Sequence, residues 1–316
     1  MKDTNMINTP KYSTRLSRRV FLGAMAAGAG LTGLPFSLRA APAAPSPAIA
    51  FDGDALLLAR DTLSRSDGRG GWIELSTLAA GGIISLATHP ARPGRIAAGL
   101  AGGGIVLSED GGQDWGARSQ GLPDAPVTAV TVAAAEPDTL YAAIRGDGLW
   151  KSEDAGRSWA LAMDRPWLAE AERDLTALAS VDLATGMGGI WIYAGTELGL
   201  TRVPDCFCRW QDVQPGDAMD ALVSGKPASP EAPLPEGEAI NGLVSAVSRP
   251  NRLYAALPSG IWRSEDAGIV WVQRSSTSAL AVAVHPANAD HVVAITGNGL
   301  TESRDGGVNW NALARA

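Results

Sequence analysis

The two cysteines of this 316-residue sequence, Cys206 and Cys208, are separated by one residue and could act together. As thiols in one tight turn they would suit a soft metal ion such as Cu(I), and as an oxidised pair they would form a strained, labile disulfide. A third interpretation, which we favour, is two small residues in a degenerate turn. With only two cysteines, the stability of the protein must come from packing rather than from several disulfides.

The three histidines do not form a recognisable set of metal ligands. His89 and His285 each precede a proline at the end of an apolar run, so they occupy equivalent positions of a repeat, and His291 stands alone before another apolar run. No cysteine or carboxylate lies at zinc-ligand spacing from any of them. We therefore expect no metal and no other cofactor.

Two segments carry side chains suited to recognition. Residues 161–175 contain Arg165 and Trp167, and Trp167 is the one tryptophan of ten outside the repeat pattern described below. Exposed Trp and Arg together are typical of interface hot spots and of sugar-binding platforms, and the alternative is a tryptophan folded back on the scaffold. Residues 214–238 are rich in Pro, Ala, Ser and acidic residues, a composition typical of a mobile loop.

Three further polar residues are candidates for partner binding. Arg145-Gly146-Asp147 spells a cell-adhesion tripeptide, but other repeats also carry Gly and polar residues in this turn, so chance explains the tripeptide better. Arg145, Asp147 and Glu197 are retained as candidates because binding residues concentrate in loops held by a rigid scaffold.

The elements that hold these side chains are expected to be short strands. The chain is 46% hydrophobic and 19% charged, which excludes a disordered protein and allows a large core. Its 37 glycines and 20 prolines punctuate runs of β-prone residues. This composition predicts an all-β protein.

One motif, Ser-x-Asp-x-Gly-x-x-Trp, recurs four times with almost no variation, and we call it the Ser-x-Asp motif. Its Ser and Asp can accept hydrogen bonds from turn amides, its Gly tolerates a positive φ, and its Trp packs over the hairpin. Two incomplete copies keep the spacing of five residues from Asp to Trp. The recurring positions are Ser108, Asp110, Gly112, Trp115, Ser152, Asp154, Gly156, Trp159, Ser264, Asp266, Gly268, Trp271, Ser303, Asp305, Gly307 and Trp310, with Asp67, Trp72, Asp205 and Trp210 in the incomplete copies.

Each motif ends a longer unit of apolar runs. Residues 140–144 and 148–152 recur as 253–257 and 260–264, and a further run precedes each pair. Three strands before each motif and one after its Trp make a propeller blade. The sequence therefore predicts a single six-bladed β-propeller of four-stranded antiparallel blades over residues 44–316. Propeller geometry places both insertions, 161–175 and 214–238, on the face opposite the Ser-x-Asp motifs.

The first 43 residues are expected to be a targeting signal. Residues 17–22, Ser-Arg-Arg-Val-Phe-Leu, resemble the twin-arginine export motif, and a weakly hydrophobic segment then leads to the small residues Ala-Pro-Ala at 41–43. Several glycines and a proline make that segment a poor transmembrane helix. We expect cleavage, no membrane insertion afterwards, and a periplasmic or secreted protein.

The remaining chain is acidic, with 20 basic against 32 acidic residues after residue 43. Nucleic acid and anionic lipid both require clustered Lys and Arg, so neither is an expected partner. A basic partner fits this charge.

The Ser-x-Asp motif resembles the Asp-box, or BNR, repeat of sialidases, sortilin-type receptors, xyloglucanases and the photosystem II assembly factor of plants and cyanobacteria. These families lie in the WD40/YVTN/BNR-like superfamily, and the resemblance covers roughly residues 48–316. It implies the fold but no shared function, because one fold carries many functions.

The sequence lacks the features that an enzyme of these families would require. A sialidase would imply a Tyr nucleophile, but Tyr141, Tyr193 and Tyr254 share one strand position and are expected to pack between blades. A xyloglucanase-like hydrolase would imply two propellers with facing carboxylates, whereas this chain has one propeller. The acidic loop residues are explained by solvated surface charge; they are Asp164, Glu170, Glu172, Asp174 and Glu197.

We therefore expect an exported propeller without catalytic residues that binds a protein partner. By analogy with the photosystem II assembly factor, it would assist the assembly or stability of an envelope complex. The alternative is a carbohydrate-binding propeller, or one of glycosidase or lyase type.

Overall fold

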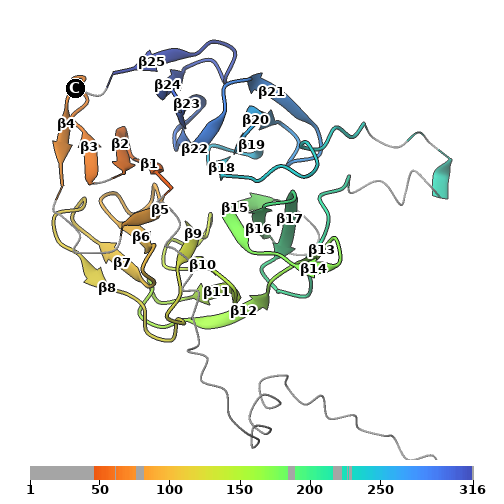
Figure 1. The fold of residues 1–316 in the computed structure, drawn as a ribbon, viewed down its shortest axis with the longest axis horizontal. Helices are drawn as coiled ribbons and strands as arrows, with labels where there is room; N and C mark the ends of the chain where they lie inside the picture. Colours follow the sequence, from red (N-terminus) through yellow and green to blue (C-terminus); the bar gives the residue numbers. More distant parts are fainter. Residues whose placement is uncertain are drawn as a thin grey trace, which may run out of the picture. The chain divides into compact units, whose positions relative to one another are not determined.

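The computed structural model describes residues 46–60, 62–75, 82–183, 189–215, 223–225, 227 and 230–314. The expected targeting signal at 1–43 and part of the second insertion lie outside the described residues. The described part forms six small antiparallel sheets arranged as the blades of a propeller, with a separate two-stranded sheet (Figure 1). The predicted all-β, six-bladed fold is confirmed.

The first three blades each contain four strands, counted from the channel outward. Blade 1 contains β1 (Ala48–Asp52), β2 (Ala55–Ala59), β3 (Leu63–Ser66) and β4 (Trp72–Glu74). Blade 2 contains β5 (Ile83–Thr88), β6 (Ile96–Leu100), β7 (Ile105–Ser108) and β8 (Gly116–Ala117). Blade 3 contains β9 (Val127–Val132), β10 (Leu140–Ile144), β11 (Gly148–Ser152) and β12 (Ala160–Asp164).

The last three blades follow the same order. The hairpin of β13 (Trp167–Leu168) and β14 (Ala171–Glu172) precedes blade 4, which contains β15 (Leu175–Leu183), β16 (Gly189–Thr196) and β17 (Leu200–Pro204). Blade 5 contains β18 (Gly242–Ala246), β19 (Arg249–Leu257), β20 (Gly260–Ser264) and β21 (Trp271–Ser275). Blade 6 contains β22 (Ala279–His285), β23 (Asn288–Thr296), β24 (Gly299–Ser303) and β25 (Asn311–Leu313). No helix within the described ranges is long and apolar enough to cross a bilayer.

Blade 4 departs from the predicted four strands. Its described residues form three strands, and the fourth is reduced to a single bridge between Arg202 and Gln211. The cause is local: Val203 and Phe207 stand where complete motifs have Ser and Gly, so the hydroxyl that holds the hairpin turn is missing. Asp205 instead accepts a hydrogen bond from Tyr141 of blade 3 at 2.7 Å.

The complete Ser-x-Asp motifs form the same local network. In blade 3, the Ser152 hydroxyl donates to Asp154 at 2.8 Å and accepts from the Gly156 amide at 2.8 Å. Asp154 also accepts from the side chain and the amide of Ser158, and these bonds lower its pKa to about 2. The network explains the spacing of the motif, because each residue type serves one bond of a single turn.

The same motifs also join neighbouring blades, which the sequence did not indicate. The Trp159 indole N–H donates to the Arg118 carbonyl of blade 2 at 2.8 Å, and that of Trp310 donates to Arg274 of blade 5 at 3.1 Å. The three predicted packing tyrosines are fully buried, and each donates its hydroxyl to the following blade; their acceptors are Asp205, Ala267 and Ala289. Blade packing is therefore specified by polar bonds as well as by apolar burial.

The ring closes without a shared strand. The innermost strands contact one another in chain order, and β22 contacts β1. Blades 1 and 6, as far as the chain is described, are each built from their own contiguous residues. Their junction includes a hydrogen bond from the Trp72 indole to the Ala314 carbonyl at 3.5 Å. Closure therefore depends on side-chain contacts.

Substituting Gly148 with alanine is expected to destabilise the protein by about 3 kcal/mol, because a positive φ and a steric clash combine there. Gly148 has a φ of 138°, and an added Cβ would lie 2.3 Å from the Met163 carbonyl oxygen. Gly146, with a φ of 75° and open space around its Cα, is the matched control, for which we expect about 1 kcal/mol. Urea denaturation of both variants measures the difference, and equal losses would contradict the clash.

Candidate partner-binding face

The first insertion forms a short hairpin. Residues 161–164 of the predicted insertion belong to β12, and the inserted element is the β13–β14 hairpin, in which Trp167 pairs with Glu172. Its two turn residues, Ala169 and Glu170, have φ values of 47° and 62°, the left-handed conformation of a two-residue hairpin turn. Neither is Gly or Asn, so surrounding contacts must hold the turn.

Arg165 ties the start of this hairpin to its end. Its guanidinium donates to Glu172 at 2.6 Å and to Asp174 at 3.1 Å, and the side chain is partly buried, with 25% of its surface exposed. The sequence suggested Arg165 as a contact for a partner. In the structure its charge pairs within the protein, where it positions the hairpin; its contact with a partner stays a prediction.

Arg173 is a second anchor, which the sequence analysis missed. It donates to the Leu168 carbonyl at 3.2 Å and to Glu197 in the β16–β17 turn at 2.8 Å. The sequence feature that could have identified Arg173 is its position between Glu172 and Asp174, just before an inner strand. Alternating charges at such a position can pair across a short hairpin. Arg173 brings the candidate residue Glu197 to the hairpin.

The Arg-Gly-Asp turn reaches the same hairpin. The Gly146 amide donates to Asp174 at 2.9 Å, and Asp147 accepts from the Trp150 indole at 2.8 Å. Arg145 is exposed beside them. All five candidates, from the turn of blade 3 to the turn of blade 4, therefore lie on one surface, which we call the hairpin face.

Trp167 is 65% exposed on this face, so the alternative of an indole folded back on its blade is wrong. Carboxylates outnumber guanidinium groups around it, and two of the three arginines are already paired with carboxylates. The acidic residues are Asp147, Asp164, Glu170, Glu172, Asp174 and Glu197, and the basic ones are Arg145, Arg165 and Arg173. The face thus presents an indole within an acidic rim.

The described end of the second insertion extends the hairpin face over blade 5. The Gly237 amide donates to the Leu198 carbonyl at 3.3 Å, and Glu238 accepts from the Ser259 amide at 2.9 Å. Leu234 is buried in the core of blades 4 and 5. The two insertions therefore border one continuous surface.

Cys206 and Cys208 form a disulfide, which corrects the favoured expectation of two residues without chemistry. Both are exposed in the incomplete motif of blade 4. Across the described ranges, no group of three His, Cys, Asp or Glu side chains converges as metal ligands.

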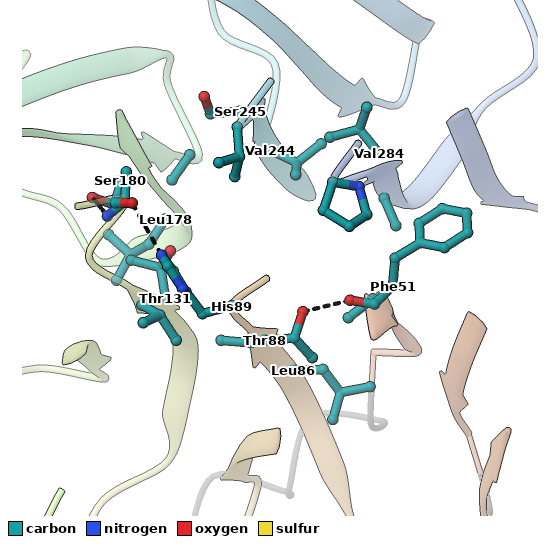
Figure 2. Close-up of a pocket in the computed structure, with 18 of the residues that line it drawn as sticks. Phe51, Leu86, Thr88, His89, Thr131, Leu178, Ser180, Val244, Ser245 and Val284 are labelled. Carbon is teal, nitrogen blue, oxygen red and sulfur yellow. Dashed lines mark hydrogen bonds between the residues drawn. The ribbon is translucent and has the colours of Figure 1, made fainter. Parts of the chain in front are cut away.

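The central channel holds a cavity of about 150 Å³ lined by the inner strands of all six blades (Figure 2). Two of its polar side chains, His89 and Ser180, bond between blades: the Ala134 carbonyl lies 3.0 Å from His89 Nε2, and the Ala134 amide donates to Ser180 at 3.0 Å. The Ala91 amide donates to His89 Nδ1 at 3.1 Å, so both ring nitrogens have partners. We therefore interpret the channel as a seam that joins the blades.

Similar hydrogen bonds between neighbouring blades occur at the other end of the channel. Side chains at the start of four inner strands each donate to a carbonyl of the following blade. These bonds run from Ser85 to Val127, from Thr128 to Leu175, from Thr176 to Ile240 and from Asn241 to Ala279.

No protein-family model and no curated protein sequence matches this chain. Among solved structures, it is similar to a GH74 enzyme from Niastella koreensis, with 17% identity and a TM-score of 0.58 over 84% of this chain and 44% of that one. It is also similar to the GH74 xyloglucanase from Xanthomonas campestris, with 20% identity and a TM-score of 0.54 over 85% and 47%. YCF48 from Cyanidioschyzon merolae aligns with 14% identity and a TM-score of 0.49 over 81% and 80%.

This chain spans slightly under half the length of the two GH74 structures that it matches. At these identities the likeness extends to the fold alone. The protein is a six-bladed β-propeller similar in fold to a propeller of the GH74 enzymes.

Proposed function

We propose that this protein is an exported, non-catalytic propeller whose hairpin face binds a protein partner, and that it acts as an assembly or stability factor for an envelope complex. Under this proposal the six motifs are Asp boxes of the BNR type, and residues 1–43 are a twin-arginine signal peptide. The observation that carries it is Trp167, 65% exposed on a hairpin that salt bridges hold in place.

A rigid, exposed indole suits an interface anchor. Tryptophan provides a large contact area with few rotatable bonds, and a hairpin that is already fixed loses little entropy on binding. Arg165 and Arg173 provide this fixation through Glu172, Asp174 and Glu197. The acidic rim favours a partner with a neutral pocket for the indole and basic groups around it.

Substituting Trp167 with alanine is expected to weaken partner binding about 30-fold, because a central aromatic hot spot contributes about 2 kcal/mol or more. The partner would be isolated from an envelope extract with tagged residues 44–316, purified, and titrated by calorimetry. Ile73→Ala is the matched control, since Ile73 is 56% exposed on blade 1, and it should bind as the wild type does.

The same pull-down tests the carbohydrate alternative. Retention of a polysaccharide that depends on Trp167, or release of sugar products from one, would replace our proposal with a carbohydrate-active propeller. A protein partner retained equally by wild type and Trp167→Ala would remove the hairpin face from the interface.

A further inference from the structure

A second chemically distinctive site lies at the incomplete motif of blade 4, apart from the hairpin face. The Cys206–Cys208 disulfide closes a loop of only three residues, and a loop this short adds little to folding stability. Both cysteines are exposed. Exposed disulfides are the ones that exchange with external thiols, so this bond is placed for reactivity rather than for stability.

The residue between the cysteines borders a pocket. Phe207 lines a cavity of about 610 Å³ between blades 3 and 4, together with Asp205, Lys151 and Leu161. Lys151 Nζ lies 5.6 Å from the centre of the Phe207 ring and 3.2 Å from Asp205. Leu161 is 44% exposed and adds an apolar wall. A molecule in this pocket would contact Phe207, the residue between the two cysteines, although neither cysteine lines the pocket itself.

The pocket also runs along a sheet edge. β12 is the outermost strand of blade 3, and its residues Ala160, Leu161 and Ala162 line the cavity. Among the described strands β12 pairs only with β11, although the Trp210 indole donates to its last carbonyl, that of Asp164, at 2.8 Å. An edge strand of this kind can add an extended peptide by backbone hydrogen bonds. Glu153, Asp154 and Asp205 outnumber Lys151 among the charged lining residues, which favours basic residues in that peptide.

We propose that Cys206 and Cys208 form a thiol–disulfide exchange site that oxidises a cysteine pair in an extended, basic peptide docked on the edge of β12. One peptide thiolate attacks a sulfur of the Cys206–Cys208 bond, forming a mixed disulfide and releasing the other cysteine as a thiolate, which takes up a proton. The second peptide thiolate then attacks the peptide sulfur of the mixed disulfide, which breaks that bond and releases the second protein cysteine as a thiolate that also takes up a proton. The peptide gains a disulfide and loses two electrons, and the protein gains two electrons and two thiols.

The test uses residues 44–316 in the oxidised form with two reductants: a reduced ten-residue peptide containing Cys-x-x-Cys flanked by Lys and Val, and dithiothreitol. Acid quenching, alkylation and mass spectrometry count thiols on both molecules. We expect one peptide oxidised per protein reduced, with folding monitored by circular dichroism. Cys206→Ser and Cys208→Ser each leave one free thiol and no disulfide at this site, so neither variant should oxidise the reduced peptide.

Leu161→Glu distinguishes docking from simple exposure of the disulfide. Removing the apolar wall and adding a charge beside Asp205 is expected to slow exchange with the peptide about tenfold and to leave the dithiothreitol rate within about twofold. Leu280→Glu, which alters a 39% exposed leucine on blade 6, is the matched control and should change neither rate. A disulfide that reacts only when the protein unfolds, or a Leu161→Glu variant that slows both reductants equally or neither, overturns the proposal.

Discussion

Glu265→Gln is expected to lower the free energy of unfolding by about 3 kcal/mol, because the Arg263 guanidinium loses its carboxylate and the Arg252 guanidinium keeps only Asp290. This is the lower end of the range for a buried pair, since the Glu265 side chain is 43% exposed. Glu265 lies 2.9 Å from Arg252 and 2.9 Å from Arg263, whose side chains are 5% and 13% exposed. Arg252 also forms an ion pair with Asp290 of blade 6. The carboxylate therefore balances the charge of a seam between blades 5 and 6.

The pKa of Arg274 reflects the several positive charges that lie close together in this seam. Burial lowers its pKa first, and the charge of Arg263 lowers it further. Glutamine keeps the size of Glu265 and its hydrogen-bonding oxygen but removes the negative charge. The remaining guanidinium groups would then repel one another in a place with little water, where such repulsion is weakly screened.

Glu109→Gln is the matched control, because Glu109 holds the same motif position in blade 2. It contacts Arg95 at 2.9 Å, and Arg95 also contacts Asp138, which would remain. We expect a loss of about 1 kcal/mol there, as for a partly exposed pair. Thermal denaturation should show a fall of roughly 10 °C for Glu265→Gln. Equal shifts in the two variants would mean that Glu265 acts only as a surface residue.

The blades could be predicted from the sequence because the interactions that define them are local. Ser152, Asp154 and Gly156 bond within one turn, so their types and spacing recur wherever the turn recurs. The position of the hairpin face followed from the same repeats, since propeller geometry assigns each connection to one face. Blade 4 differs from the predicted four strands, and it is a blade whose motif is incomplete.

The details of the face could not be predicted, because they depend on conformations that the sequence does not signal. The pairing of Arg165 with Glu172 requires a tight turn at Ala169 and Glu170, and neither residue favours a positive φ. The disulfide was one of three outcomes open to Cys206 and Cys208. In each case the deciding contact is set by the fold and not by residue type.

Ring closure is the extreme case, because its partners are far apart in sequence. His285 Nε2 lies 2.8 Å from Asp54 Oδ1 of blade 1, a separation of 231 residues. The ring of His285 stacks on that of His291, with centroids 5.3 Å apart, and Phe51 of blade 1 contacts both rings edge-on. Two imidazoles that looked unrelated in the sequence thus form one junction between blades 6 and 1.

This junction should weaken in acid. Burial is the main cause that lowers the pKa of His291, the charges of Arg304 and His285 lower it further, and the hydrogen bond to Glu302 opposes them. Because the unfolded chain takes up this proton near pH 6.5, stability is complete above that pH and is lost as the pH falls from there towards the lower folded pKa.

We therefore expect the backbone amides of β1–β4 and β22–β25 to lose protection from hydrogen exchange first when the pH is lowered from 7.5 to 5.5. The rates are compared after correction for the intrinsic effect of pH. These strands flank the junction between blades 6 and 1, which is not continuous in sequence and where the ring is expected to open. His291→Gln can still donate to Glu302 but does not titrate, so it should keep more of its protection at pH 5.5. His89→Gln is the control, because His89 is buried between blades 2 and 3 and bonds to backbone groups there. Acid-induced opening that is unchanged in His291→Gln, or that begins at blades 2 and 3, would show that the stacked pair does not control closure.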